Sequence, residues 1–247
     1  MRVDLCSHAT YNLRAMFDER LRDGLPRVRE RIAAALERSG RAGEVRLVAV
    51  TKGHPVDAAR AAWRAGITDL GENRVQELAE KRVVFPAGEP GPIWHLIGHL
   101  QRNKARRALE LSDWIQSVDS TRLALELSRE AVRAGRPVRV LVQVNVSGEA
   151  TKGGFDASQA VAEVAEVADL PNLEVAGLMT IAPYTDDEKA IRSVFAGTRA
   201  LLDRCVAEGV ALHGRELSMG MTHDYEAAIA EGSTMVRLGT ALFGERL

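Results

Sequence analysis

The chain has 247 residues, of which 46% are hydrophobic; this is enough to bury one substantial core, so we expect a single domain over residues 1–247. Its 33 basic and 34 acidic residues leave a formal net charge of −1, which excludes the overall field that draws proteins to nucleic acid or to anionic membranes. Cys6 and Cys205 form no zinc-binding pattern with histidine, and charged residues interrupt every apolar run, so we expect a cytoplasmic protein without a metal, a signal peptide or a membrane span.

Helical periodicity fills the N-terminal part of the chain. We predict one helix that ends near Asp23 and Gly24, and a second helix over residues 25–37, whose apolar positions share one face. Ser39 and Gly40 are typical of the end of that second helix.

Eight short apolar runs follow, separated by longer amphipathic segments, a pattern typical of repeated strand–helix units around a parallel sheet. The predicted strands cover residues 45–51, 69–71, 93–97, 114–118, 138–146, 173–179, 216–219 and 235–238. Seven helices are predicted between these strands. The first begins at Pro55, the fourth follows an N-cap at Ser120 and extends to residue 134, and the fifth ends near residue 169. The others cover residues 75–83, 103–111, 186–208 and 223–230.

Eight such units without a long structureless gap favour closure into a (β/α)8 TIM barrel, an α/β fold that here carries an extra N-terminal helix. An open, doubly wound sheet is the structural alternative. The Gly-x-Gly-x-x-Gly turn that binds dinucleotides does not follow the first strand, which weakens the dinucleotide-binding form of that alternative.

Small and hydroxyl-bearing residues follow the last two predicted strands, where this fold commonly binds a phosphate. Strand seven runs into Ser218-Met219-Gly220-Met221-Thr222, and strand eight runs into Arg237-Leu238-Gly239-Thr240. Glycine lets main-chain amides approach a ligand, and both turns precede helices. Together the turns predict a cradle for a dianion, although each one alone fits an ordinary tight turn equally well.

Lysine is rare in this chain, which makes each one informative. Lys52 alone directly ends an apolar strand; desolvation there lowers the pKa of its amine and frees the lone pair to attack a carbonyl. The alternative is a strand-end lysine that extends to solvent. We expect Lys81 and Lys189 to be solvated on charged helices, and Lys104 and Lys152 to lie near the rim of the site.

An amine after strand one and a phosphate cradle after strands seven and eight match pyridoxal 5′-phosphate, which carries both an aldehyde and a phosphate. Arg237 would then lie near the pyridine nitrogen. Because arginine stays protonated, it would donate to that nitrogen and keep the ring a weak electron sink. The alternative is a structural ion pair between Arg237 and Glu216 or Glu245.

Motifs over most of the chain resemble those of one family, the YggS/PROSC-type pyridoxal phosphate homeostasis proteins, relatives of the barrel domain of alanine racemase (fold type III). The segments that carry the resemblance are Ala49-Val50-Thr51-Lys52, Gly71-Glu72-Asn73-Arg74-Val75-Gln76-Glu77, Trp94-His95-Leu96-Ile97-Gly98, Gln143-Val144-Asn145-Val146, Gly177-Leu178-Met179, Leu217-Ser218-Met219-Gly220-Met221 and Ser233-Thr234-Met235-Val236-Arg237-Leu238-Gly239-Thr240.

The resemblance implies a role for each matching residue. It makes Lys52 the lysine that carries pyridoxal 5′-phosphate as an aldimine (a Schiff base), and it places Arg237 at the pyridine nitrogen. It further implies phosphate contacts from Ser218, Gly220, Gly239 and Thr240, and ring contacts from Asn73 and Met179. The chain departs from the family pattern at Gly53-His54, Leu70 and His99, so we expect a rim of different shape around an unchanged cofactor attachment. His54 and His99 either contact ligand or are ordinary surface or loop histidines.

The family's role is to buffer and deliver the cofactor, and the sequence supports binding without turnover. Alanine racemases add a C-terminal β domain that supplies a tyrosine base, whereas we expect no such domain after strand eight, so no residue is assigned as catalytic. Of the three tyrosines, Tyr11, Tyr184 and Tyr225, only Tyr184 would face the cavity. A weak amino-acid racemase and a Schiff-base aldolase without the cofactor are the alternatives. We expect a monomer whose partners are the cofactor and, transiently, apo-enzymes that depend on it.

Overall fold

The computed structural model describes residues 5–85, 90–149 and 153–246, with side chains from residue 13 onward. Eight parallel strands form a closed barrel in the order β4-β3-β2-β1-β9-β8-β7-β5, and the pairing of β4 with β5 closes the ring. Their bounds are β1 (Arg46–Val50), β2 (Asp69–Glu72), β3 (Ile93–Leu96), β4 (Trp114–Val118), β5 (Val138–Asn145), β7 (Leu173–Met179), β8 (Glu216–Ser218) and β9 (Met235–Leu238). The predicted barrel is therefore confirmed, and the open sheet is excluded.

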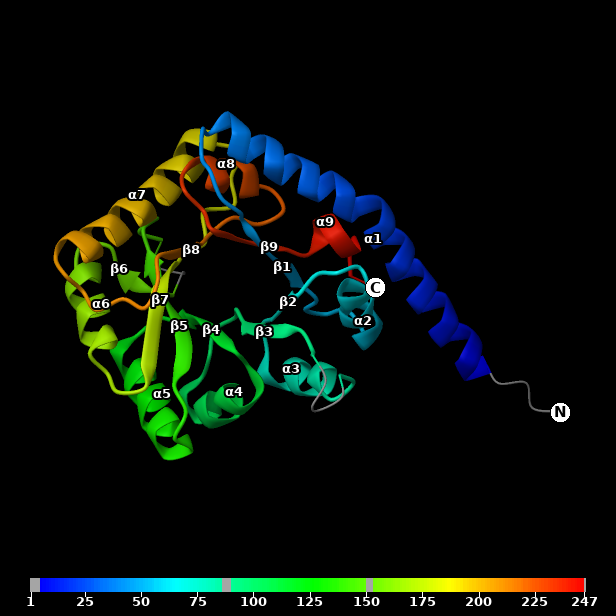
Figure 1. The fold of residues 1–247 in the computed structure, drawn as a ribbon, viewed down its shortest axis with the longest axis horizontal. Helices are drawn as coiled ribbons and strands as arrows, with labels where there is room; N and C mark the ends of the chain where they lie inside the picture. Colours follow the sequence, from blue (N-terminus) through cyan, green and yellow to red (C-terminus); the bar gives the residue numbers. More distant parts are fainter. Residues whose placement is uncertain (1–4, 86–89, 150–152, 247) are drawn as a thin grey trace.

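Helices surround the strands in an outer ring (Figure 1). They are α2 (Val56–Arg64), α3 (Val75–Arg82), α4 (Ala105–Leu111), α5 (Thr121–Ala134), α6 (Ala160–Ala168), α7 (Glu188–Ala207), α8 (Tyr225–Ala230) and the short α9 (Thr240–Phe243). The predicted N-cap is confirmed, because the Ser120 hydroxyl accepts a hydrogen bond from the Leu123 amide at 3.4 Å.

The N-terminal helix differs from the prediction. A single helix, α1 (Leu5–Arg38), continues through Pro26, so the expected break near Asp23 and Gly24 is wrong. Proline has no amide hydrogen, so it removes the helical hydrogen bond to the Arg22 carbonyl. The neighbouring Asp23 carbonyl accepts from the Arg27 Nε at 2.9 Å. The helix lies along the edge of the barrel against α2, α8 and α9 (Figure 1). Its buried face consists of Phe17, Leu21, Leu25, Val28, Ile32 and Ala35.

Three small elements were not predicted. A two-residue strand, β6 (Phe155–Asp156), pairs beside the end of β5, so the following helix starts later than expected. A 3-10 turn, η1 (Arg102–Lys104), precedes α4, and α9 follows β9. Each element is at most four residues long, too short for hydrophobic periodicity to show.

The main core lies between the strands and the outer helices, and a smaller apolar cluster fills part of the barrel interior. The interior cluster comprises Val48, Trp114, Leu141, Ala176, Met179 and Met235. Polar side chains occupy the rest of the interior, among them His95, Gln116, Ser218 and Arg237, all buried. In most barrels of this type branched apolar residues dominate these positions, so the polar content requires an explanation.

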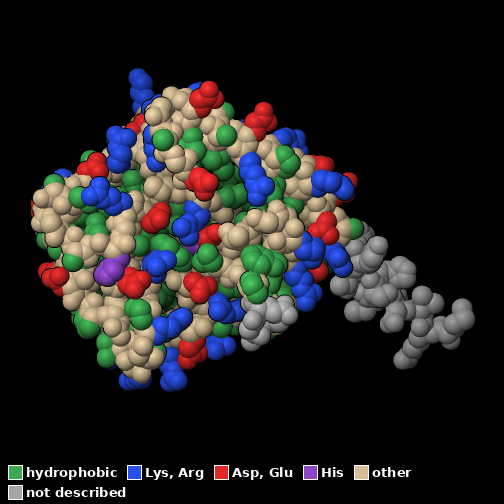
Figure 2. Space-filling view, in the orientation of Figure 1, with side chains coloured by type: hydrophobic (Ala, Val, Ile, Leu, Met, Phe, Trp, Pro, Cys, Tyr) green, Lys and Arg blue, Asp and Glu red, His purple; other side chains and the backbone are tan. Residues whose placement is uncertain are grey.

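The surface agrees with the balanced charge of the sequence. Figure 2 shows acidic and basic side chains interleaved over the face that it displays. Within the described residues, no helix is both long and apolar enough to cross a bilayer.

Candidate functional site

One rim of the barrel collects the C-terminal ends of all eight strands, because every strand pairing is parallel. Lys52 lies on this rim, two residues after β1 ends. On one side β1 pairs with β9, in a register that places Ala49 opposite Leu238. Gly239 and Thr240, which follow β9, are thus beside the segment that carries Lys52, as the sequence predicted.

The environment of Lys52 makes its amine a weaker base. Burial lowers the pKa of Lys52, the positive charges of Arg246 and Arg237 lower it further, and Glu72 and Glu77 oppose the shift. The next residue, Gly53, has a φ of 70° that favours glycine, and its amide donates to a Glu77 carboxylate oxygen at 2.9 Å. The turn after β1 is therefore fixed, with the amine half-buried at the mouth of the barrel.

A buried ion pair lies behind Lys52, and sequence reasoning missed it. Lys81 was expected to be solvated, but its side chain is only 5% exposed and pairs with the fully buried Glu72 at 2.6 Å. The Lys81 ammonium also donates to the Thr51 carbonyl at 2.6 Å, and the Thr51 hydroxyl donates to the same Glu72 oxygen. These contacts hold the main chain immediately before Lys52.

Arg237 is buried and held by three hydrogen bonds. Its Nη1 donates to the Ser218 carbonyl at 2.7 Å and to the Ser218 hydroxyl at 2.6 Å, and its Nη2 donates to the Thr180 carbonyl at 2.9 Å. Burial lowers the pKa of Arg237 to about 10, with Asp224 opposing, so the group stays charged at neutral pH. A guanidinium has five N–H groups; the Nε–H and one Nη2–H make no hydrogen bond within the described part of the chain.

The structural alternative for Arg237 does not apply among the described residues. Glu216 instead accepts a hydrogen bond from the Thr234 hydroxyl at 2.6 Å, and neither Glu216 nor Glu245 forms an ion pair with Arg237. Arg237 is thus held by neutral oxygens, and its charge is not neutralised by a contacting carboxylate.

Main-chain amides gather after β8 and β9. Within the described residues, the amides of Gly239 and Thr240 make no hydrogen bond, at the start of α9. Gly220 has a φ of 97°, and a Cβ there would lie 2.7 Å from the Ala228 Cβ, so only glycine fits this turn. The Thr222 hydroxyl accepts from the Ala241 amide at 3.3 Å, which brings the two turns together.

Thr222 is a further polar group beside these amides that was not predicted, because the sequence does not show which hydroxyl of the turn, that of Ser218 or that of Thr222, lies next to α9. Ser218 is fully buried, and its hydroxyl donates to the Gln116 side-chain oxygen at 2.7 Å while accepting from Arg237. Its hydroxyl therefore points into the barrel interior, whereas the Thr222 hydroxyl lies next to the amides of the second turn.

The two residues expected at the ring also lie at strand ends. Asn73 follows β2 and is half-buried; a Cβ on Gly98 would lie 2.4 Å from the Asn73 carbonyl oxygen, so glycine there allows the two loops to touch. Met179 ends β7 and is fully buried in the interior cluster.

The remaining candidates at the rim have other surroundings. His54 is buried, with its ring 5.6 Å from those of both Phe17 and Phe243, so it is a packing residue rather than a surface one. His99 is exposed and bonds to Asp119 at 2.8 Å. Lys104 is half-buried in η1, Lys189 is exposed as expected, and Lys152 lies outside the described residues.

The donor set suits a small ligand that combines an aldehyde, a phosphate and a ring nitrogen. An amine of lowered pKa attacks a carbonyl readily. Amides at a short helix after the eighth barrel strand commonly hold a phosphate in this fold. A charged guanidinium with uncommitted donors supplies a hydrogen bond to an unprotonated ring nitrogen. All three groups lie at one rim.

Comparison with known proteins agrees with this arrangement. Residues 25–247 match the family model described as the alanine racemase N-terminal domain. The chain is similar to the pyridoxal phosphate homeostasis protein of Aquifex aeolicus, at 42% identity over 90% of this chain and 96% of the relative. It is also similar to the structure of PipY from Synechococcus elongatus PCC7942 with PLP bound, at 40% identity and a TM-score of 0.76, over 86% of this chain and all of that one.

A more distant likeness concerns the fold alone. Alanine racemase from Clostridium difficile 630 shares 20% identity and a TM-score of 0.69, over 90% of this chain and 56% of the racemase. The barrel described above is therefore of the same kind as the barrel of that enzyme.

Proposed function

The chain belongs to the family of pyridoxal phosphate homeostasis proteins, and on that premise we propose that it binds pyridoxal 5′-phosphate covalently and reversibly at Lys52, buffering and delivering the cofactor without turning over a substrate. One observation carries the proposal: an amine of lowered pKa, a charged guanidinium and two amides that find no partner in the described part of the chain share one rim. When bound, the cofactor supplies an aldehyde that reacts reversibly with amines.

Lys52 supplies the nucleophile. Its lowered pKa raises the fraction of neutral amine at neutral pH. The Lys81–Glu72 pair holds the preceding carbonyl of Thr51, which limits the positions that the amine can reach. Preorganisation of this kind favours capture of the aldehyde at low free concentration.

The phosphate role belongs to the two turns after β8 and β9. We assign main-chain contacts to Gly220, Gly239 and Thr240, as the sequence predicted, and add the hydroxyl of Thr222. Ser218 keeps a place in the site, but as the support of Arg237, since its own hydroxyl is already engaged in the interior. Asn73 and Met179 are assigned to the edge of the ring, from their positions at the ends of β2 and β7.

Arg237 supports binding over racemisation. A guanidinium donates to the pyridine nitrogen and leaves it unprotonated, which weakens the ring as an electron sink. The two tyrosines whose side chains are described offer no second base: Tyr184 is 89% exposed and packs against His223, and Tyr225 lies beneath the Arg31 guanidinium, against α1. We therefore propose transfer of the cofactor to apo-enzymes, by a cytoplasmic monomer, as the role of this site.

Borohydride reduction of the cofactor-loaded protein, followed by peptide mapping, tests the proposal. We expect the label on Lys52, and we expect Lys52→Ala to lose the bound chromophore while Lys104→Ala, a change to a half-buried lysine after β3, keeps it. A label on Lys104 would refute the assignment. Proton–deuterium exchange at the α carbon of a free amino acid, dependent on Lys52, would favour a racemase instead. A purified protein that shows no bound chromophore after cofactor addition would favour the aldolase.

A further inference from the structure

A continuous line of hydrogen-bonded side chains crosses the inside of the barrel, and the proposed function leaves most of it unexplained. We call it the interior polar chain. Its members, in order, are Arg237 of β9, Ser218 of β8, Gln116 of β4, His95 of β3, Asp69 of β2 and Arg46 of β1. The first member faces the proposed cofactor site, and the last lies at the opposite rim.

The links from Arg237 to Asp69 are short contacts between buried groups. Beyond the 2.6 Å bond from Arg237 to Ser218, the Ser218 hydroxyl lies 2.7 Å from Gln116. The Gln116 amide nitrogen lies 2.8 Å from the His95 Nδ1, and the His95 Nε2 lies 2.9 Å from Asp69. Ser218, Gln116 and His95 are 0% exposed, so no water competes for these bonds.

Only one set of donors and acceptors satisfies the interior polar chain. Asp69 accepts from His95, which makes Nε2 the protonated ring nitrogen and leaves Nδ1 to accept from the Gln116 amide. The Gln116 oxygen then accepts from Ser218, whose oxygen in turn accepts from Arg237. Every donor points towards the next acceptor, so the orientation of each group fixes that of its neighbour.

The ionisation states support the same directions. Burial lowers the pKa of His95 despite the opposing Asp69, so the imidazole is neutral at neutral pH. Burial alone would raise the pKa of Asp69, but hydrogen bonds from His95 and Thr68 outweigh it and lower the pKa. A neutral imidazole between a carboxylate and an amide has a single orientation, so the interior polar chain does not switch direction near neutral pH.

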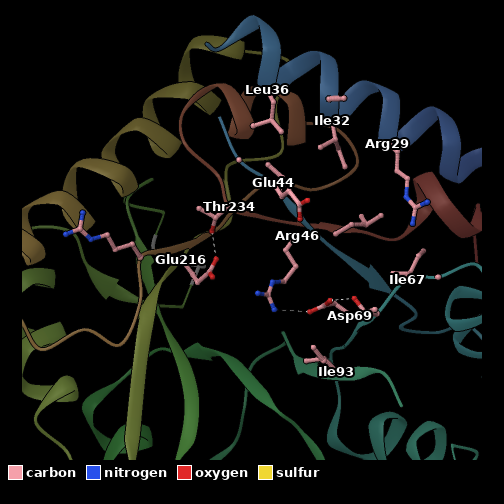
Figure 3. Close-up of a pocket in the computed structure, with 17 residues that line it drawn as sticks. Arg29, Ile32, Leu36, Glu44, Arg46, Ile67, Asp69, Ile93, Glu216 and Thr234 are labelled. Atoms are coloured by element: carbon pink, nitrogen blue, oxygen red, sulfur yellow. Dashed lines mark hydrogen bonds and ion pairs between the residues drawn. The ribbon is translucent and has the colours of Figure 1, made fainter. Parts of the chain in front are cut away.

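The far end of the interior polar chain is anchored. Figure 3 shows Arg46 and Asp69, joined by a dashed line, in the cleft at the rim where the strands begin; the two groups are 3.3 Å apart. Trp114 stacks on the His95 ring at 5.6 Å and an interplanar angle of 19°, and the Arg46 guanidinium lies 5.5 Å from its centre. The Trp114 indole thus contacts both His95 and Arg46, the two side chains that bond to Asp69.

Stability alone does not account for these residues. Buried polar groups are costly to desolvate even when they are paired, and replacing a buried polar cluster by apolar residues of similar volume is often neutral or stabilising. Branched apolar residues are the usual filling of such barrels. The interior polar chain ends on Arg237, whose charge acts on Lys52 and whose Nε–H and one Nη2–H make no hydrogen bond among the described residues.

We propose that Gln116 and His95 are positioning residues, which hold Arg237 through Ser218 so that its uncommitted donors point to the pyridine nitrogen of the cofactor. This inference rests on the proposed function. The guanidinium has three bonds to oxygens of β8 and of the segment after β7; the hydroxyl bond is the one that the interior polar chain orients. Without it, Arg237 keeps its two carbonyl contacts but loses the third of the bonds that fix the orientation of its guanidinium.

The test uses wild-type protein and variants loaded with cofactor that carries ¹⁵N in the ring, and it measures both the ring-nitrogen resonance and the Kd. Gln116→Met keeps side-chain volume but removes the amide. We expect the resonance to move towards that of a nitrogen without a donor, and the Kd to rise about tenfold, within the range for losing one hydrogen bond to a charged group. Ser218→Ala should act alike, while Ser218→Thr, which keeps a hydroxyl, should restore the wild-type resonance.

A matched control separates positioning from general destabilisation. Thr198→Val removes a fully buried hydroxyl that donates to the Val194 carbonyl at 2.8 Å, outside the barrel interior, and it should leave the resonance unchanged. A wild-type resonance in folded Gln116→Met or Ser218→Ala would overturn the inference while leaving cofactor binding intact. If the wild-type protein itself takes up no cofactor, the proposed function fails instead. Should Gln116→Met not fold, the two Ser218 variants decide the question.

Discussion

The buried pair of Lys81 and Glu72 allows a quantitative prediction about the support of Lys52. Lys81→Met keeps an unbranched side chain of similar length but removes the charge and two hydrogen bonds of 2.6 Å each. Glu72 is fully buried, and one of its oxygens has no partner among the residues that the structure describes, so Glu72 would keep only the bond from Thr51. A buried charge without its counter-ion typically costs about 3–5 kcal/mol.

That cost is large against the roughly 5–15 kcal/mol by which a domain is stable. We therefore expect the urea midpoint of Lys81→Met to fall sharply. Tryptophan fluorescence can follow the unfolding, since Trp94 is buried on the neighbouring strand β3. The double variant Lys81→Met/Glu72→Gln should recover much of the loss, because the remaining amide is neutral. Lys189→Met changes an exposed lysine and should shift the free energy of unfolding by less than about 0.5 kcal/mol.

Two outcomes would refute this reasoning. A loss below about 1 kcal/mol for Lys81→Met would mean that the charge is not desolvated as the contacts indicate. A double variant whose loss equals the sum of the two single losses would mean that the pair is not coupled. Lys81→Met and the double variant should both bind pyridoxal 5′-phosphate more weakly than the wild-type protein, because the Thr51 carbonyl before Lys52 loses its donor.

Further predictions concern the backbone and the response to pH. Gly177→Ala should prevent stable folding, because the φ of Gly177 is 148° and a Cβ would lie 2.0 Å from the Glu216 carbonyl oxygen. Gly66→Ala, with a φ of 78° and open space around the Cβ, should cost only about 1 kcal/mol. Equal melting temperatures for the two variants would contradict this. Burial lowers the pKa of both His95 and His54. As the pH drops, these histidines therefore take up protons in the unfolded chain first, near the usual histidine pKa of about 6.5. The free energy of unfolding should fall as the pH drops from 7 to 5. In urea titrations, His54→Phe should flatten part of that slope, and an unchanged slope would count against a buried neutral imidazole at that position.

The strands and their order could be predicted because each one is a short apolar run bounded by turn residues. The rim position of Lys52 followed from that pattern, since every strand of such a barrel ends at the same side. Helix α1 was predicted less well, because Asp23 and Gly24 argue locally for a break, whereas the helix continues through them and packs against α2, α8 and α9.

Residues whose role depends on distant partners could not be predicted. Lys81 lies in a charge-rich helix, and nothing local shows that it reaches a carboxylate on β2. Gln116 and His95 lie within predicted strands, yet their contact joins residues 21 apart, and Gln116 meets Ser218 102 residues further on. Periodicity assigns such residues to a face of a strand and says nothing about which side chains meet across the barrel.

The packing of α1 against α9 has a consequence for how the protein acquires its cofactor during synthesis. Arg20 of α1 donates to the Phe243 carbonyl, 223 residues away, and the rings of Phe17 and Phe243 enclose His54, two residues beyond Lys52. At roughly 5–20 residues per second, a ribosome takes on the order of 10–45 s to make that length of chain. The loop that carries Lys52 gains this support only once α9 has been made and has packed against α1. We therefore expect a nascent chain that still lacks α9 to capture the aldehyde less efficiently than the folded protein.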